Sequence, residues 1–139
     1  MKKYLSFTAI FCLLAFYLQA QNADYRVVFD MTSKDSINQQ SLVRELGLIR
    51  KYNPDAKMEV VMYGAGLNLV VKDRTPQQQP AVEKLIMDKN ISFKVCAIAM
   101  ERQAITKDQL LAGIQVVPDG IYEIVSKQRE GWGYIKVSH

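Results

Sequence analysis

Short apolar runs alternate along this chain with longer stretches in which apolar residues recur at helical spacing. The runs are rich in Val, Ile and Met and are bounded by Gly, Pro, Asn or Asp. Nearly continuous apolar runs of this length are typical of strands that are covered on both faces. Five strands are therefore predicted, at residues 25–30, 58–63, 91–97, 114–117 and 132–137.

The stretches between these runs predict helices. In residues 36–52, Leu42 and Leu46 begin an apolar stripe at i, i+4 spacing. Pro54 ends this pattern, because proline biases the residue before it away from the helical region. Further helical segments are predicted at residues 80–89, 106–111 and 118–130.

Strands that alternate with helices predict an α/β fold. The expected architecture is a three-layer sandwich, with a mostly parallel five-stranded sheet and helices on both faces. The direction of the last strand stays open. Asp30, Tyr63 and Cys96 end the first three strands. In open parallel sheets, ligands bind at the carboxyl edge, so a site is predicted where these residues and Gly64 meet.

The N-terminus has the pattern of a secretory signal. Two lysines follow the first methionine, an apolar run covers residues 4–18, and Ala20 offers a small residue for cleavage. We therefore expect a signal peptide at 1–20, a single domain at 21–139, and a periplasmic or secreted protein. The alternative is an uncleaved N-terminal anchor. No later apolar stretch is long enough to span a bilayer, so no integral membrane segment is expected after cleavage.

Charge and histidine content narrow the function classes. The formal charge of +4 includes the two lysines of the predicted signal. No run of Lys and Arg interleaved with aromatic residues is present, which disfavours nucleic-acid binding. His139, the single histidine, is the last residue. A metal site needs three or four suitably spaced ligands, so neither a metal nor a cofactor is predicted.

Cys96 is the candidate reactive residue. The chain has two cysteines, and Cys12 lies in the predicted signal, so Cys96 would be an unpaired thiol in an exported protein. Three interpretations stay open: a reactive thiol, an inert buried cysteine, or a disulfide between chains. A reactive thiol must ionise, and nearby cations such as Lys94 or Arg102 favour the thiolate.

Two further residues are weaker candidates. Asn68 follows the glycine-rich turn at Gly64, where its amide would orient a ligand; the alternative is a turn residue bonded to its own backbone. Asp30 would act as a general base at the same edge, or would instead cap the following segment.

Five sequence blocks follow one another over the predicted domain: Tyr25 to Asp35, Glu59 to Asn68, Phe93 to Ala97, Leu110 to Gly120, and Ile124 to Ile135. In their order and spacing, these blocks resemble the DsrE/DsrF-like proteins, a family that contains small sulfur-relay subunits.

The resemblance implies a compact α/β domain that often assembles into trimers or hexamers. It also implies that Cys96 receives sulfane sulfur as a persulfide and passes it to a partner thiol. This chain has Ile98 and Ala99 where many members have polar residues, and Tyr63 where many have histidine. The alternative function is a non-enzymatic oligomeric binding module on the same scaffold, with an inert cysteine.

Overall fold

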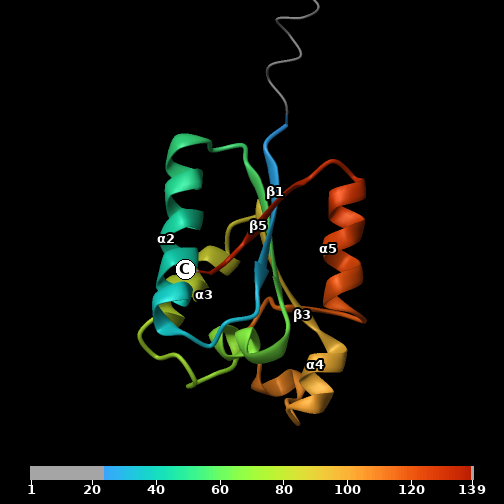
Figure 1. The fold of residues 1–139 in the computed structure, drawn as a ribbon. Helices are drawn as coiled ribbons and strands as arrows, with labels where there is room; N and C mark the ends of the chain where they lie inside the picture. The colour runs from blue at the N-terminus through green and yellow to red at the C-terminus, as the bar shows by residue number, and fades with distance from the viewer. Residues whose placement is uncertain (1–23, 139) are drawn as a thin grey trace, which may run out of the picture.

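A five-stranded sheet forms the middle layer of the computed structural model, which describes residues 24–138 (Figure 1). Its strand order is β4-β3-β2-β1-β5, and every neighbouring pair is parallel. The last strand thus joins the β1 edge in the parallel direction. The strands are β1 (Arg26–Met31), β2 (Lys57–Met62), β3 (Ile91–Cys96), β4 (Gln115–Val117) and β5 (Gly133–Lys136).

Helices cover both faces of this sheet, which confirms the predicted three-layer α/β fold. In Figure 1, α2 (Ser36–Tyr52) and α3 (Gln79–Ile86) lie on one side, and α5 (Gly120–Arg129) lies on the other. The short helix α4 (Ala97–Arg102) follows β3 directly. Two 3₁₀ segments complete the fold, η1 (Gly64–Val70) and η2 (Lys107–Gln109).

The helix ends follow from local chemistry. Before α2, the Asp35 carboxylate accepts a hydrogen bond from Ile37 N at 2.8 Å, which satisfies a free amide of the first turn. The helix ends before Pro54 and spans the predicted residues 36–52. Gly131 follows α5 with a φ of 84°, the left-handed conformation that glycine adopts without strain.

Two local features differ from the sequence-based expectation. The turn after β2 continues as the 3₁₀ segment η1, and a Cβ on Gly66 would clash with the backbone of Met31. This glycine therefore lets the segment pack against β1. The helical piece predicted at 106–111 is shorter, because only η2 forms there, with Thr106 and Gln109 closing a capping box.

The two faces of the sheet carry different side chains. The face under α2 and α3 is apolar, and its fully buried residues include Phe29, Val60 and Phe93. The opposite face holds a small apolar cluster of Val28, Val61 and Ile124. Around that cluster lie charged and polar side chains, among them Asp30, Glu59, Ser92 and Lys94. The strands thus alternate in polarity although both faces are covered.

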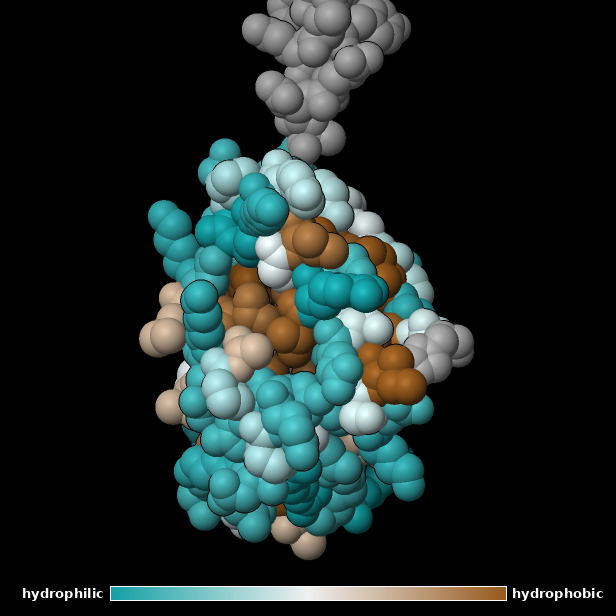
Figure 2. All heavy atoms as spheres, turned by 90° about the vertical axis from the view of Figure 1, so that its left-hand side faces the viewer, coloured by the Kyte–Doolittle hydropathy of each residue, from teal (hydrophilic) through white to brown (hydrophobic). Residues whose placement is uncertain are grey.

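Several sequence-based predictions lie outside the described residues. These are the signal peptide at 1–20, Cys12 and His139. Within residues 24–138, no helix is long and apolar enough to cross a membrane. Seen from the α2 side, hydrophilic side chains cover much of the surface, and apolar surface shows in a hollow between them (Figure 2).

Candidate functional site

A pocket of about 510 Å³ lies at the carboxyl edge of the sheet, where β2 and β3 end and where α4 and α5 begin. Its position is the one predicted from the strand order. Its wall is mainly apolar. The residues that line it are Tyr63, Gly64, Ala65, Cys96, Ile98, Ala99, Arg102, Gln103, Asp119 and Ile121.

Cys96 is recessed in this pocket. It is the last residue of β3, it immediately precedes α4, and it is 5% exposed. Gly120, the first residue of α5, packs on it: a Cβ built there would lie 3.2 Å from Cys96 Cβ and 3.3 Å from Val61 Cγ1. A larger residue at position 120 would therefore push α5 away from the sheet or displace the cysteine.

The polar side chains of the pocket differ in whether they already have a bonding partner. Gln103 Nε2 donates to Gly64 O at 2.6 Å and so ties the end of α4 to the glycine turn. Asp119 caps α5, because its Oδ1 accepts from Ile121 N at 2.8 Å and from Tyr122 N at 3.3 Å. Arg102 is exposed, and among residues 24–138 it has no ion-pair partner.

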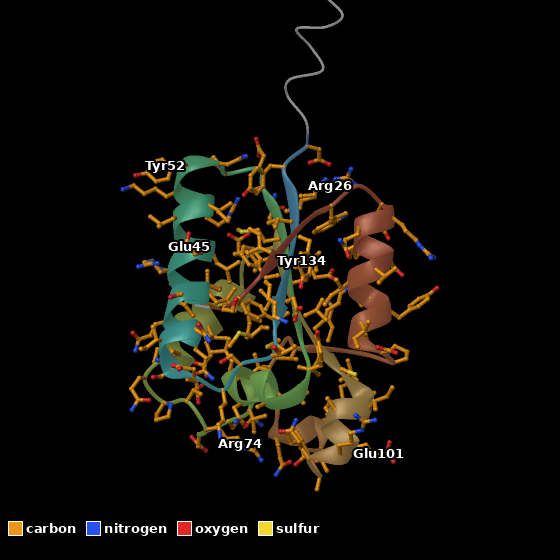
Figure 3. All side chains as sticks on the ribbon, in the orientation of Figure 1. Arg26, Glu45, Tyr52, Arg74, Glu101 and Tyr134 are labelled. Carbon is orange, nitrogen blue, oxygen red and sulfur yellow. The ribbon has the colours of Figure 1, made fainter. Side chains whose placement is uncertain are left out.

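Tyr63 connects the pocket to a buried carboxylate. Its hydroxyl donates to Asp30 Oδ2 at 3.3 Å, and Tyr134 on β5 donates to the same oxygen at 2.7 Å. Tyr134 lies near the middle of the fold in Figure 3. The hydrogen bond to Asp30, with burial, raises the pKa of Tyr134 to about 12. Burial and the charge of Asp30 also raise the pKa of Tyr63. Both phenols therefore stay protonated at neutral pH and hold Asp30 in place.

Lys94 belongs to a separate buried cluster with Glu59 and Glu123. Its Nζ lies 2.9 Å from Glu59 Oε2 and 2.6 Å from Glu123 Oε1. Burial would lower the pKa of Lys94, but hydrogen bonds to Glu123 and Glu59 outweigh it and raise the pKa. Lys94 thus pairs with two carboxylates. It therefore favours the thiolate of Cys96 less than the sequence suggested.

The two carboxylates of this cluster differ. Burial raises the pKa of Glu59 above its ordinary value, despite the hydrogen bond from Lys94. Burial also opposes ionisation of Glu123, but the hydrogen bonds with Lys94 and Glu59 lower its pKa. Glu123 therefore keeps its charge to a lower pH than Glu59 does.

The structure brings together four of the predicted site residues, Cys96, Tyr63, Gly64 and Arg102. Asp30 lies behind the pocket and reaches it through Tyr63, and it does not cap the following helix, since Asp35 does so. Asn68 does not line the pocket. Its Oδ1 accepts from Arg74 Nη1 at 2.8 Å, and Arg74 lies well to the side of Glu101 of α4 in Figure 3.

Sequence reasoning missed Gln103, Asp119 and Ile121 as pocket residues. The signal for the latter two was present, because Asp119 opens the helix after β4 and parallel strands share one carboxyl edge. Over residues 24–138, no group of three or more His, Cys, Asp or Glu side chains is arranged to hold a metal ion.

A comparison with models of protein families identifies the family of this chain. The model of the DsrE/DsrF-like family matches residues 25–137. The chain belongs to the DsrE/DsrF-like family. The described residues form the compact α/β domain that the resemblance implied.

Three solved structures are similar in fold to this DsrE/DsrF-like chain. A protein of unknown function, MTH1491 from Methanobacterium thermoautotrophicum, is 30% identical, with a TM-score of 0.76 over 81% of this chain and 99% of that chain. The ychN protein from E. coli is 13% identical, with a TM-score of 0.68 over 81% and 98%. The conserved protein BT1422 from Bacteroides thetaiotaomicron is 16% identical, with a TM-score of 0.67 over 83% and 97%. The comparison with curated proteins found no match.

Proposed function

We propose that this DsrE/DsrF-like protein carries sulfane sulfur as a persulfide on Cys96. The observation that carries the proposal is the thiol recessed in a pocket of about 510 Å³ at the carboxyl edge of the sheet. Because a persulfide adds one sulfur atom to the side chain, the pocket has room for the loaded form. Its apolar wall also limits contact between water and the reactive sulfur.

The loading step transfers one sulfur atom and needs no outside oxidant. The Cys96 thiolate attacks the outer sulfur of a donor persulfide, R–S–SH. The S–S bond of the donor breaks, Cys96–S–SH forms, and R–S⁻ leaves with the bonding electron pair. Delivery is the same reaction in the other direction, with a partner thiolate attacking the outer sulfur of Cys96–S–SH.

Intact mass spectrometry tests the proposal on the full chain. Incubation with a persulfide donor, without reducing agent, should add about 32 Da, and peptide mapping should place this sulfur on Cys96. The Cys96→Ser variant retains Cys12 and serves as the matched control. Absence of added sulfur on Cys96 in the unsubstituted chain, or its location on Cys12 alone, would contradict the proposal.

A second candidate is a non-enzymatic binding module with an inert cysteine. It is favoured by the low exposure of Cys96 and by the apolar lining from Ile98, Ala99 and Ile121. Free cysteines often behave as small buried apolar residues. In that case Cys96→Ser would leave both assembly and ligand binding unchanged, and sulfane sulfur would not be taken up.

The proposal includes a homo-oligomer in the periplasm or outside the cell. Support for assembly comes from the exposed apolar side chains of Ile98, Ile121 and Tyr122 near the pocket, because such groupings favour protein contacts. Light scattering coupled to size-exclusion chromatography should give the mass of a trimer or hexamer. Cell fractionation of the tagged full chain should place it in an extracytoplasmic fraction, and a cytosolic, monomeric protein would contradict this part.

A further inference from the structure

Arg102 is the charged side chain of the pocket that is free to meet a ligand. Among residues 24–138 it forms no ion pair, although it lines the same pocket as Cys96. The pocket acid, Asp119, directs its Oδ1 to the first amides of α5, where the helix dipole compensates a negative charge. Lys94, the cation two residues before Cys96, is held by Glu59 and Glu123.

We infer that the pocket selects a small anionic sulfane-sulfur donor, whose acidic group pairs with Arg102 while its outer sulfur reaches Cys96. This inference rests on the proposed function and names the substrate class of that site. The guanidinium group offers a planar set of donors that matches a carboxylate or sulfonate. The apolar residues Ile98 and Ile121 line the pocket and suit the uncharged stem of the donor.

The position of the thiol favours a small donor over a folded one. Cys96 is 5% exposed, so a donor has to reach into the pocket to meet its sulfur, which a small molecule does more easily than a folded surface. A pocket of about 510 Å³ accommodates a low-molecular-weight persulfide, since ligand pockets commonly span roughly 300–1,000 Å³.

Both possible sources of the anion give a balanced reaction. With a carboxylate-bearing persulfide, the Cys96 thiolate takes the outer sulfur and the carboxylate-bearing thiolate leaves. With thiosulfate, the thiolate attacks the sulfane sulfur, its bond to the sulfonate sulfur breaks, and sulfite leaves as the dianion. The carboxylate and the sulfonate would each pair with Arg102, so the two donors form separate arms of the test.

The test compares two persulfides that differ in one charged group. The persulfide of 3-mercaptopropionate is anionic, and the persulfide of 3-mercaptopropionamide is its neutral counterpart. We expect the full chain to load Cys96 about three- to ten-fold faster from the anionic donor at limiting concentration, as suits a charge contact at a partly exposed site. The difference should lie in KM, because Arg102 acts in binding the donor.

Two substitutions locate the effect. Arg102→Gln should remove the preference, so that the anionic and the neutral donor load Cys96 at equal rates. Arg129→Gln is the matched control, because Arg129 is also exposed, also lies in the last turn of a helix, and does not line the pocket. It should keep the preference. If thiosulfate also loads Cys96 and loses rate in Arg102→Gln, a sulfonate is accepted as the anion.

The outcomes separate this inference from the proposed function. Equal loading from the two persulfides, or a preference that survives Arg102→Gln, would overturn the inference while the carrier function stands. Loading from a protein-bound persulfide but from neither small donor would also overturn it. Failure of every donor to modify Cys96 would contradict the proposed function itself.

Discussion

The same strands present apolar side chains on one face of the sheet and charged side chains on the other. Under α2 and α3, Phe29, Val60 and Phe93 are almost completely buried among other apolar side chains. Under α5, the same strands present Glu59 and Lys94, and Lys94 pairs both with Glu59 and with Glu123 of the helix. Apolar burial is insensitive to pH, whereas a buried ion cluster depends on the protonation of its members.

This difference locates the chemistry in the fold. The α5 face leads to the pocket, because Gly120 at the start of α5 packs on Cys96 and Val61. Lys94 and Glu123 hold α5 against the sheet two residues upstream of the cysteine. The apolar face therefore supplies most of the stability, and the polar face sets the position of the helix that covers Cys96.

The largest expected effect comes from one substitution on each face. Phe93→Ala should lower the free energy of unfolding by about 3–5 kcal/mol, because it removes a buried ring from a packed core. Lys94→Met should cost a similar amount, about 3–5 kcal/mol at neutral pH, because the buried Glu59 and the half-buried Glu123 then lose their cation. Denaturant titration of both variants measures these losses.

The pH dependence distinguishes these two variants. As the pH falls and Glu59 and Glu123 take up protons, the cost of Lys94→Met should shrink, while the cost of Phe93→Ala should stay constant. A constant cost for Lys94→Met between neutral and acid pH would mean that the cluster contributes through packing and not through charge. Lys57→Met, which removes an exposed partner of Asp24, should cost less than about 1 kcal/mol.

The two carboxylates of the cluster should respond in opposite directions. The pKa of Glu123 is lowered, so its contribution to stability is present above its ordinary value of 4.5 and is lost as the pH falls. The pKa of Glu59 is raised, so its contribution is present in acid and is lost as the pH rises through the raised pKa. At neutral pH, Glu123→Gln should therefore cost about 1–3 kcal/mol and Glu59→Gln less. The reverse order in thermal or denaturant unfolding would contradict these assignments.

Two glycine-to-alanine substitutions test how closely a helix packs on each face of the sheet. Gly120→Ala should cost about 1–3 kcal/mol, because the new Cβ would press on Cys96 and Val61. Gly47→Ala in α2 should instead stabilise the protein by about 0.5–1 kcal/mol, because nothing lies within 4 Å of that Cβ and alanine favours the helix. Chemical denaturation measures both. Equal effects at the two positions would argue against the close packing of α5 on the cysteine.

The last expected effect concerns Asp30 and is read from a titration and not from the free energy of unfolding. Asp30→Asn removes the charge that helps to raise the pKa of Tyr134 to about 12, so this pKa should fall toward its ordinary value of 10.0. Ultraviolet absorbance during an alkaline titration follows the phenolate, and Tyr134→Phe identifies which step belongs to this residue. An unchanged titration step in Asp30→Asn would show that burial alone sets the pKa.

The fold was predictable from the sequence because its signals are local. The Asp35 cap and Pro54 define α2 from within a few residues, and strand–helix alternation implies the parallel sheet. The shared carboxyl edge then places Tyr63 and Cys96 together. By contrast, the cluster of Glu59, Lys94 and Glu123 joins two strands and a helix that are far apart in sequence.

The burial of the cysteine was equally hidden from the sequence. Cys96 is recessed because Gly120 lets α5 approach it, and this contact depends on how the helix crosses the sheet. The same reasoning applies to Asp30, which a local pattern suggests as a helix cap. Its two phenolic donors come from β5 and from the end of β2, so only the folded sheet brings them together.

The central claim is that Cys96 holds and releases sulfane sulfur, and one pair of mass measurements tests it most directly. The full chain is loaded with a persulfide donor, separated from the donor, and weighed before and after addition of an excess acceptor thiol. The account predicts a gain of about 32 Da located on Cys96 and its loss to the acceptor. An unmodified Cys96 under these conditions, in a chain that is folded and oligomeric, would contradict it.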